Sequence, residues 1–192
     1  MRTGLSSYGL IFQALQCNIN CPCQPDCKNR LVQQGCDRPL RVKYFGSEKG
    51  HGLVAENEIH KGEFIIEYMG EYLNLEAVNE RQVYQRENDK MNYILSLAEV
   101  FGNGEKEIVH IDAGKLGNAA RFANHSCSPN SKLYPVRVEN DIARIAIFAE
   151  RFIEPGEEIT YDYGSAESTL SERKCQCGSR CCRHFMPSDI NL

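Results

Sequence analysis

Nine of the ten cysteines in this 192-residue chain fall into two clusters, and thiols spaced so closely are well suited to binding a metal ion. The C-terminal cluster has the pattern C-x-C-x4-C, and neighbours this close rarely reach disulfide geometry with each other. A structural zinc ion takes four ligands in a tetrahedron, and the isolated Cys127 can supply the fourth thiolate. The sequence therefore predicts a zinc site built from Cys127, Cys175, Cys177 and Cys182.

The N-terminal cluster holds Cys17, Cys21, Cys23, Cys27 and Cys36. Residues 1–16 contain no convincing secretory signal, because polar residues interrupt the apolar stretch and no cleavage site follows it. We therefore expect a reducing compartment, in which these thiols bind metal rather than form disulfides.

Three further segments could contribute to a ligand site. The run from Arg121 to Asn130 (R-F-A-N-H-S-C-S-P-N) is too polar for a core strand, so it is either an ordinary loop after a short helix or a binding segment. Tyr161 and Tyr163 would face the same side of a strand, where they either pack in the core or wall a site. Gly50-His51-Gly52 is a G-x-G turn that either reverses the chain or lets the backbone approach a ligand closely.

These motifs lie between short strands that are broken by glycines. Segments rich in Ile, Val, Phe and Tyr predict strands, and these are residues 40–45, 53–55, 64–72, 92–97, 108–111, 133–138, 142–148 and 158–161. Asn74 can cap a helix that runs to about Asp89, with Glu76 in its first turn. Residues 164–174 are predicted to be a polar linker. The predicted fold is mainly β, with one substantial helix among short helices.

Composition argues against two classes of function. The formal net charge is −4, which disfavours a long phosphate-binding surface and hence strong direct nucleic-acid binding. The longest apolar stretches, such as residues 143–149, are too short to span a bilayer.

Two segments are rich in acids: residues 56–90 hold nine acids against four bases, and residues 139–162 hold seven against two. These segments form either a solvated acidic face or a surface that attracts a basic peptide.

Taken together and in this order, the motifs resemble those of the SET-domain lysine methyltransferases over residues 17–185. The resemblance rests on K-G-H-G-L, E-Y-M-G-E, N-Y-I-L, R-F-A-N-H-S-C-S-P-N, G-E-E-I-T-Y-D-Y-G and the final C-x-C-x4-C. Residues 17–35 look like the end of a pre-SET zinc region, which marks the histone H3 lysine-9 branch. Within that branch the chain resembles the SET half of SET–mariner fusion proteins.

The resemblance implies a SET-domain β-fold with a C-terminal pseudoknot and a zinc-binding post-SET tail. The implied boundaries are an unassigned leader at 1–16, a partial pre-SET cysteine cluster at 17–36, a SET domain at 37–164, and a linker with the post-SET zinc tail at 165–192. In the pseudoknot, the R-F-A-N-H-S-C and Y-D-Y segments thread together, an exception to the rule that chains avoid threading. Distant residues would thereby meet in one site.

The resemblance also implies S-adenosyl-L-methionine as the methyl donor and assigns roles by motif. Expected cofactor contacts are Lys49, Gly50, His51, Gly52, Tyr93, Asn124 and His125. Expected catalytic residues are Tyr163, Tyr93 and Tyr161. Family members usually carry Trp where this chain has His51, a difference that could weaken packing on the cofactor.

The physical demands of methyl transfer agree with these roles. The sulfonium methyl group is already activated, so the enzyme has only to place a neutral amine in line with it. Lysine has a pKa near 10.4, so only about one side chain in a thousand is neutral near pH 7.4. A channel of tyrosine rings can desolvate the ammonium and lower its pKa. Tyr161 occupies the family's Phe/Tyr switch, and a tyrosine there implies mainly mono- and dimethylation.

The implied substrate is a lysine of the histone H3 tail, with lysine-9 favoured and lysine-36 the runner-up, or another lysine-bearing protein. The implied location is the nucleus, on chromatin, with no membrane association.

Two departures from the family pattern support an alternative, a catalytically weak SET module that binds histone tails or partner proteins. One is His51. The other is the pre-SET remnant, which keeps four of the nine family cysteines and could hold one zinc ion in place of three; the four are Cys17, Cys21, Cys23 and Cys27. Cys36 and Cys181 fall outside the pattern and are expected to be free thiols, although Cys181 could compete with Cys182 for the metal.

Overall fold

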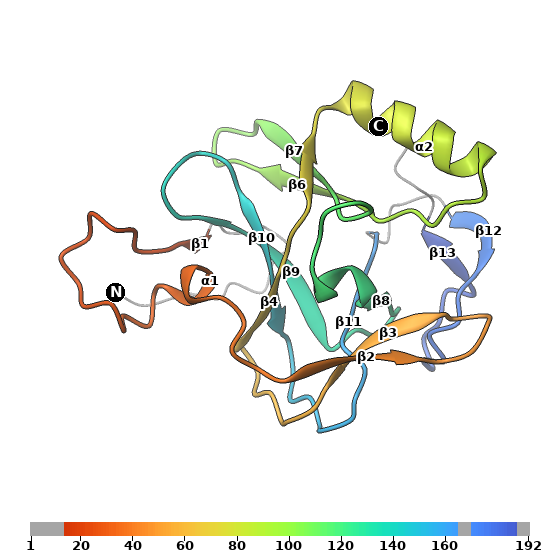
Figure 1. Ribbon diagram of the computed structural model, residues 1–192, viewed down its shortest axis with the longest axis horizontal. Coiled ribbons are helices and arrows are strands. Elements are labelled where there is room, and N and C mark those ends of the chain that lie inside the picture. The colour runs from red at the N-terminus through yellow and green to blue at the C-terminus, as the bar shows by residue number, and fades with distance from the viewer. Residues whose placement is uncertain (1–13, 165–169, 188–192) are drawn as a thin grey trace.

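The computed structural model describes residues 14–164 and 170–187, and in these ranges the chain is mainly β (Figure 1). One sheet has the strand order β1-β9-β10-β4, comprising Ala14–Leu15, Ser131–Arg137, Arg144–Ala149 and Phe64–Tyr68. A second has the order β5-β7-β6, comprising Glu71–Leu73, Lys106–Asp112 and Ile94–Val100.

Three strand pairs and three helices complete the described fold. The pairs are β2 (Leu40–Tyr44) with β3 (His51–Ala55), β8 (Asn124–His125) with β11 (Thr160–Tyr161), and β12 (Leu170–Lys174) with β13 (Phe185–Pro187). The helices are α1 (Leu31–Gln34), α2 (Leu75–Glu87) and the 3₁₀-helix η1 (Ala119–Phe122). Figure 1 shows the β12–β13 pair at the opposite end of the molecule from β1 and α1.

The core is centred on strands whose two faces are both covered. β10 pairs with β9 on one side and β4 on the other, and its residues Ile145, Ala146 and Ile147 are all fully buried. Residues 53–55 of β3 are likewise fully buried. Continuous burial explains why these strands read as unbroken apolar runs rather than alternating ones.

Most predicted strands are confirmed, but two expectations are wrong. The single strand expected at residues 64–72 divides into β4 and β5, which belong to different sheets. The two strands are separated near Gly70, where a Cβ atom would lie 2.4 Å from the carbonyl oxygen of Asp112. The polar linker expected at residues 164–174 contains β12, which pairs with β13. Residues 1–13 of the leader and 165–169 of the linker lie outside the described residues.

The predicted helix cap is confirmed. The Asn74 side chain accepts a hydrogen bond from the backbone N–H of Ala77 at 2.9 Å, and α2 follows it. Arg81 holds this helix against the second sheet, because its Nη1 atom lies 2.8 Å from Glu71 Oε2 and 2.5 Å from Asp112 Oδ2. Among the described residues, no helix is long and apolar enough to cross a membrane.

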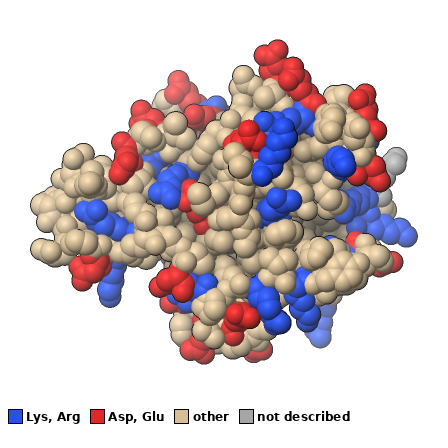
Figure 2. Space-filling view, in the orientation of Figure 1, with Lys and Arg blue, Asp and Glu red and all other residues tan. Residues whose placement is uncertain are grey.

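The acid-rich segment at residues 56–90 does not form one uniform acidic face. Four of its carboxylates pair with arginines of the same chain: Glu56 with Arg41, Glu63 with Arg38, Glu67 with Arg144, and Glu71 with Arg81. Figure 2 shows acidic and basic side chains interspersed on the visible face. Part of the predicted negative charge is therefore neutralised inside the fold.

Asn130 joins the two segments that carry the polar motifs. This side chain is only 1% exposed. Its Nδ2 atom donates to Glu157 Oε1 and to the Glu158 carbonyl, both at 2.8 Å, and its Oδ1 atom accepts from the Thr160 N–H at 2.9 Å. One buried amide therefore binds backbone that lies about thirty residues away.

Replacing Asn130 by alanine removes these bonds and leaves buried backbone groups unpaired. Each unsatisfied group costs about 1–3 kcal/mol, so we expect Asn130→Ala to lower the free energy of unfolding by about 3 kcal/mol. Urea denaturation followed by circular dichroism measures this. The exposed Asn79 of α2 provides the control, and Asn79→Ala should change stability by less than about 0.5 kcal/mol. Equal effects of the two substitutions on the free energy of unfolding would contradict the stabilising role of the Asn130 hydrogen bonds.

Candidate active site and metal centre

The short parallel pair of β8 and β11 forms the centre of the candidate site. Thr160 pairs with Asn124, and Tyr161 pairs with His125. The backbone N–H of Ser126 extends this pairing by donating to the carbonyl of Tyr161 at 3.1 Å. The polar run and the tyrosine pair, which are distant in sequence, therefore lie side by side.

The rings of Tyr161 and Tyr163 lie on the same side, as their spacing predicts, with 4.8 Å between centroids. The Tyr163 hydroxyl donates to the carbonyl of Ala123 at 2.8 Å, and Tyr161 is buried. Removal of the hydroxyl groups from water raises the pKa of both phenols above the ordinary value, although the Tyr163 residue as a whole is 41% exposed. Both side chains are therefore neutral at physiological pH, and they offer hydroxyl groups rather than a phenolate base.

Tyr93 belongs to the loop before β6 and is linked to the G-x-G turn through aromatic contacts. The guanidinium of Arg121 lies 4.0 Å from the centroid of its ring. Phe122 meets Tyr93 edge-on at 6.5 Å between centroids and lies 6.0 Å from the ring of His51. The Tyr93 carbonyl accepts a hydrogen bond from the Tyr68 hydroxyl at 2.8 Å. These contacts fix Tyr93 beside η1.

Asn124 connects the G-x-G turn to the strand pair. Its Nδ2 atom donates to the His51 carbonyl and to Glu158 Oε1, both at 2.9 Å. Glu158 also forms an ion pair with Lys49, and its side chain is only 13% exposed. The G-x-G turn with its neighbour Lys49, the polar run and the segment before β11 therefore meet at the largely buried carboxylate of Glu158.

The two glycines of the turn are required for different reasons. Gly50 has a φ of 75°, in the left-handed region that favours glycine. At Gly52 a Cβ atom would lie 2.4 Å from Glu158 Oε1 and 2.7 Å from the Phe45 ring. The tight-turn interpretation thus explains both glycines without a ligand, and their contact with a cofactor stays a prediction.

His125 is buried and engaged at both ring nitrogens. Nδ1 accepts a hydrogen bond from the Tyr163 N–H at 3.2 Å, so Nε2 carries the proton and faces Cys127 Sγ at 3.2 Å. Burial is the main cause that lowers the pKa of His125, although Asp162 opposes it. The ring is therefore neutral at physiological pH and occupied in holding its neighbours, which makes it a poor general base.

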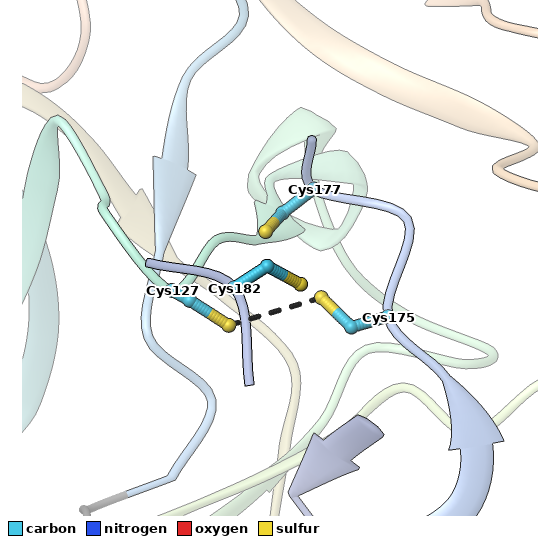
Figure 3. A group of neighbouring side chains, drawn as sticks. All are labelled: Cys127, Cys175, Cys177 and Cys182. Atoms are coloured by element: carbon cyan, nitrogen blue, oxygen red, sulfur yellow. Dashed lines mark hydrogen bonds between the residues drawn. The ribbon is translucent and has the colours of Figure 1, made fainter. Parts of the chain in front are cut away.

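Four cysteines converge from the polar run and the C-terminal tail (Figure 3). The sulfurs of Cys127, Cys175, Cys177 and Cys182 all lie within 4.8 Å of one another, and those of Cys127 and Cys175 are 3.8 Å apart. Thiolates around a tetrahedral zinc ion, with Zn–S bonds of about 2.3 Å, lie about 3.8 Å from one another. The four predicted ligands are thus brought together in a geometry that could hold a metal ion.

The thiols of this cluster differ in acidity. Burial raises the pKa of Cys175 to about 12. Burial acts in the same direction on Cys177, but hydrogen bonds from the Ser179 side chain and the Cys127 backbone lower its pKa to about 6. The Cys177 thiolate therefore forms readily, whereas the Cys175 thiol needs the charge of a cation to lose its proton. Metal binding would thus release protons from the cluster.

The N-terminal cluster assembles only in part. The sulfurs of Cys17, Cys23 and Cys27 lie within 4.8 Å of one another. Cys21 is not in this group, and its sulfur faces Asn18 Oδ1 at 3.7 Å. Arg30 donates to the Cys23 sulfur at 3.3 Å and to the Cys21 carbonyl at 3.4 Å, so a guanidinium holds this segment together. The structure gathers three of the four predicted thiols, and metal binding by this cluster stays a prediction. Cys36 and Cys181 are exposed and belong to neither group of clustered thiols.

A hollow of about 650 Å³ lies beside the cysteine cluster. Its lining includes Lys49, His125 and Glu158 on one side and residues 177–181 of the tail on the other. This volume is in the range of small-molecule sites. Of the seven predicted cofactor contacts, Lys49 and His125 line it, while the others lie around Asn124 and the turn.

Sequence analysis did not identify the charged residues that connect the motifs. Glu158 and Arg121 both stand inside quoted motifs, but nothing in their spacing distinguished them from solvated charges. The signal available was their position: Glu158 stands beside the buried Ile159, and Arg121 stands beside Ala120, which is also fully buried. A charge next to a buried position often has a partner inside the protein.

Comparison with known proteins gives a consistent result. The family model of the SET domain matches residues 50–164. The chain is 38% identical over 190 residues to "Histone-lysine N-methyltransferase SETMAR" of Bos taurus, covering 92% of this chain and 61% of that protein. It is 41% identical over 182 residues to "Probable histone-lysine N-methyltransferase set-23" of Caenorhabditis briggsae, covering 92% and 73%.

The fold is likewise shared with a solved structure. The methyltransferase domain of human SETMAR matches with a TM-score of 0.81 and 31% identity, covering 93% of this chain and 68% of that one. The chain spans about three fifths of the bovine relative, or 61% of its length. On the family match, the relatives and the fold together, this chain belongs to the SET-domain family.

Proposed function

We propose that this chain is an S-adenosylmethionine-dependent protein-lysine N-methyltransferase that acts on histone H3. The observation that carries the proposal is the pairing of β8 with β11, which lays Asn124 and His125 beside Tyr161 and Tyr163. The relatives of similar sequence bear the names of histone-lysine methyltransferases, which supports the same reaction here.

The proposed cofactor contacts are residues 49–52, Tyr93, Asn124 and His125. The donor set fits such a ligand, because the neighbouring hollow presents the ammonium of Lys49 and the carboxylate of Glu158 to a molecule that itself carries both signs of charge. When bound, S-adenosylmethionine supplies a methyl group that is already activated. His51 stands where most family members have Trp; its ring, 5.2 Å from that of Tyr44, still offers an aromatic surface.

The chain's own task is to present a neutral lysine. We propose that the rings of Tyr93, Tyr161 and Tyr163 exclude water from the ammonium group, which lowers its pKa. Their hydroxyls, together with nearby backbone carbonyls, would hold the reacting carbon through weak C–H···O contacts. Because the phenols stay neutral and both His125 nitrogens are engaged, the proton leaves to solvent before transfer.

Substrate and product are finer parts of the proposal. We favour lysine-9 of histone H3 over lysine-36, on the likeness of residues 17–35 to a pre-SET region, and we place the protein on chromatin in the nucleus. Tyr161 supports mono- and dimethylation, because its hydroxyl, kept neutral by burial, occupies space that a further methyl group would need. Methylation of arrayed histone peptides, resolved by mass spectrometry, tests the choice of lysine.

We further propose that the tail cluster binds zinc as the post-SET site of residues 165–192. Cys177→Ser removes one of four ligands, so zinc measured by inductively coupled plasma mass spectrometry should fall by about one ion per chain. Cys181→Ser, at the exposed neighbouring thiol, should leave the zinc content unchanged. Equal zinc in the Cys177→Ser protein and the wild type would contradict the site.

Tyr163→Phe removes the hydroxyl that donates to Ala123. We expect kcat for labelled methyl transfer to histone H3 to fall by about 10²-fold with the fold retained, because an aligned polar group at a reacting centre contributes about that much. Tyr84→Phe, on the exposed face of α2, is the control and should keep full activity. Binding of an H3 peptide by a wild-type protein that transfers no methyl group would favour the weakly catalytic module instead.

Tyr161→Phe tests the product state. Loss of this buried hydroxyl frees space in the proposed channel, so the main product should shift from mono- and dimethyllysine towards trimethyllysine. Mass spectrometry of a histone H3 peptide over a time course measures the distribution. Trimethylation by the wild type, or an unchanged distribution in the variant, would refute the role of Tyr161.

A further inference from the structure

Arg183 forms hydrogen bonds to the residues on both sides of Tyr163. Its Nη2 atom donates to Asp162 Oδ1 at 2.5 Å, and its Nη1 atom donates to the carbonyl of Gly164 at 3.3 Å. Asp162 and Gly164 are the residues immediately before and after Tyr163. A planar guanidinium that binds both neighbours restricts the rotation of the segment between them.

The other end of Arg183 is attached to the cysteine cluster. Its backbone N–H donates to Cys127 Sγ at 3.3 Å. The residue before it, Cys182, is one of the four clustered thiols. A short rigid path thus runs from the candidate metal centre, through the backbone and side chain of one residue, to the backbone of residues 162–164.

Tyr163 is also held from the polar run, because its N–H donates to His125 Nδ1 and its hydroxyl donates to the Ala123 carbonyl. Arg183 contacts this run as well, since its Nη2 atom lies 3.3 Å from His125 Nε2. From the tail, Arg183 bonds to Asp162 and Gly164, the residues on either side of Tyr163. Its side chain is 23% exposed, so the bond to the Asp162 carboxylate is only partly screened by water.

We propose that Arg183 is a positioning residue that transmits the geometry of the cysteine cluster to Tyr163. The inference rests on the proposed function, because it assigns Arg183 an effect on methyl transfer. Misplacement of a reacting group by about 1 Å can cost about 10²-fold in rate, so even a partial loss of restraint should be measurable.

The test uses the zinc-loaded full chain with Arg183→Ala, Arg183→Lys and the control Lys174→Ala, which removes an exposed cation from the same tail. Three quantities are measured: metal content, kcat and KM for a histone H3 peptide, and hydrogen–deuterium exchange of residues 162–164 without cofactor. In Arg183→Ala we expect unchanged metal content, a kcat about tenfold lower, KM within about twofold, and exchange about tenfold faster. Arg183→Lys keeps the positive charge but loses the planar guanidinium that can bind two acceptors at once. Its kcat and its exchange rate should therefore lie between those of Arg183→Ala and the wild type.

Several outcomes would overturn the inference. One is unchanged exchange in Arg183→Ala; another is faster exchange with unchanged kcat, which would make the contact structural only. Loss of metal together with kcat would also overturn it, because the effect would then pass through the cluster itself. If the wild type transfers no methyl group, the proposed function fails, while the exchange rates still decide whether Arg183 restrains Tyr163.

Discussion

A buried polar side chain must satisfy its hydrogen bonds inside the protein, and in this molecule that requirement holds the site together. Asn130 is almost fully buried, and its amide both donates to and accepts from the segment that leads into β11. A register shift of one residue would leave these groups unpaired, at a cost comparable to a large part of a small domain's stability. Asn130 therefore sets which residues of β8 and β11 face each other, and the positions of His125 and Tyr161 follow from it.

Electrostatic contacts then attach the remaining segments to this strand pair. The carboxylate of Glu158 is largely buried and is stabilised by Lys49 and by the Asn124 amide, so the G-x-G turn is drawn against β8. On the opposite side, the four thiols and Arg183 attach the C-terminal tail. The aromatic residues between these anchors are neutral, which suits the proposed function, in which they take up a cationic side chain and favour its uncharged form before methyl transfer.

The sequence alone predicted the elements and motifs that have strong local signals. The Asn74 cap, the apolar run of β10 and the C-x-C-x4-C pattern each depend on neighbours within a few residues, and each is found in the fold. The break at Gly70 was missed because its cause, the backbone of Asp112, lies far along the chain. The separation of Cys21 from the other three thiols could not be read from spacing either, because it accompanies contacts to Asn18 and Arg30 that depend on the local fold. The partners of Glu158 and Arg183 could not be found from pattern, since they come from other segments.

The parallel pairing of β8 with β11 has a consequence for the order in which the chain folds. Two residues on each strand are too few to persist alone, and a parallel pair needs a long crossover between its members. Here the crossover includes β9 and β10, which are neighbours in sequence and form an antiparallel hairpin through local contacts. Local pairings form before distant ones, because closing the long loop costs entropy that only existing structure can offset. The candidate site therefore depends on the β9–β10 hairpin, because β8 and β11 can meet only where the segment between them is already folded.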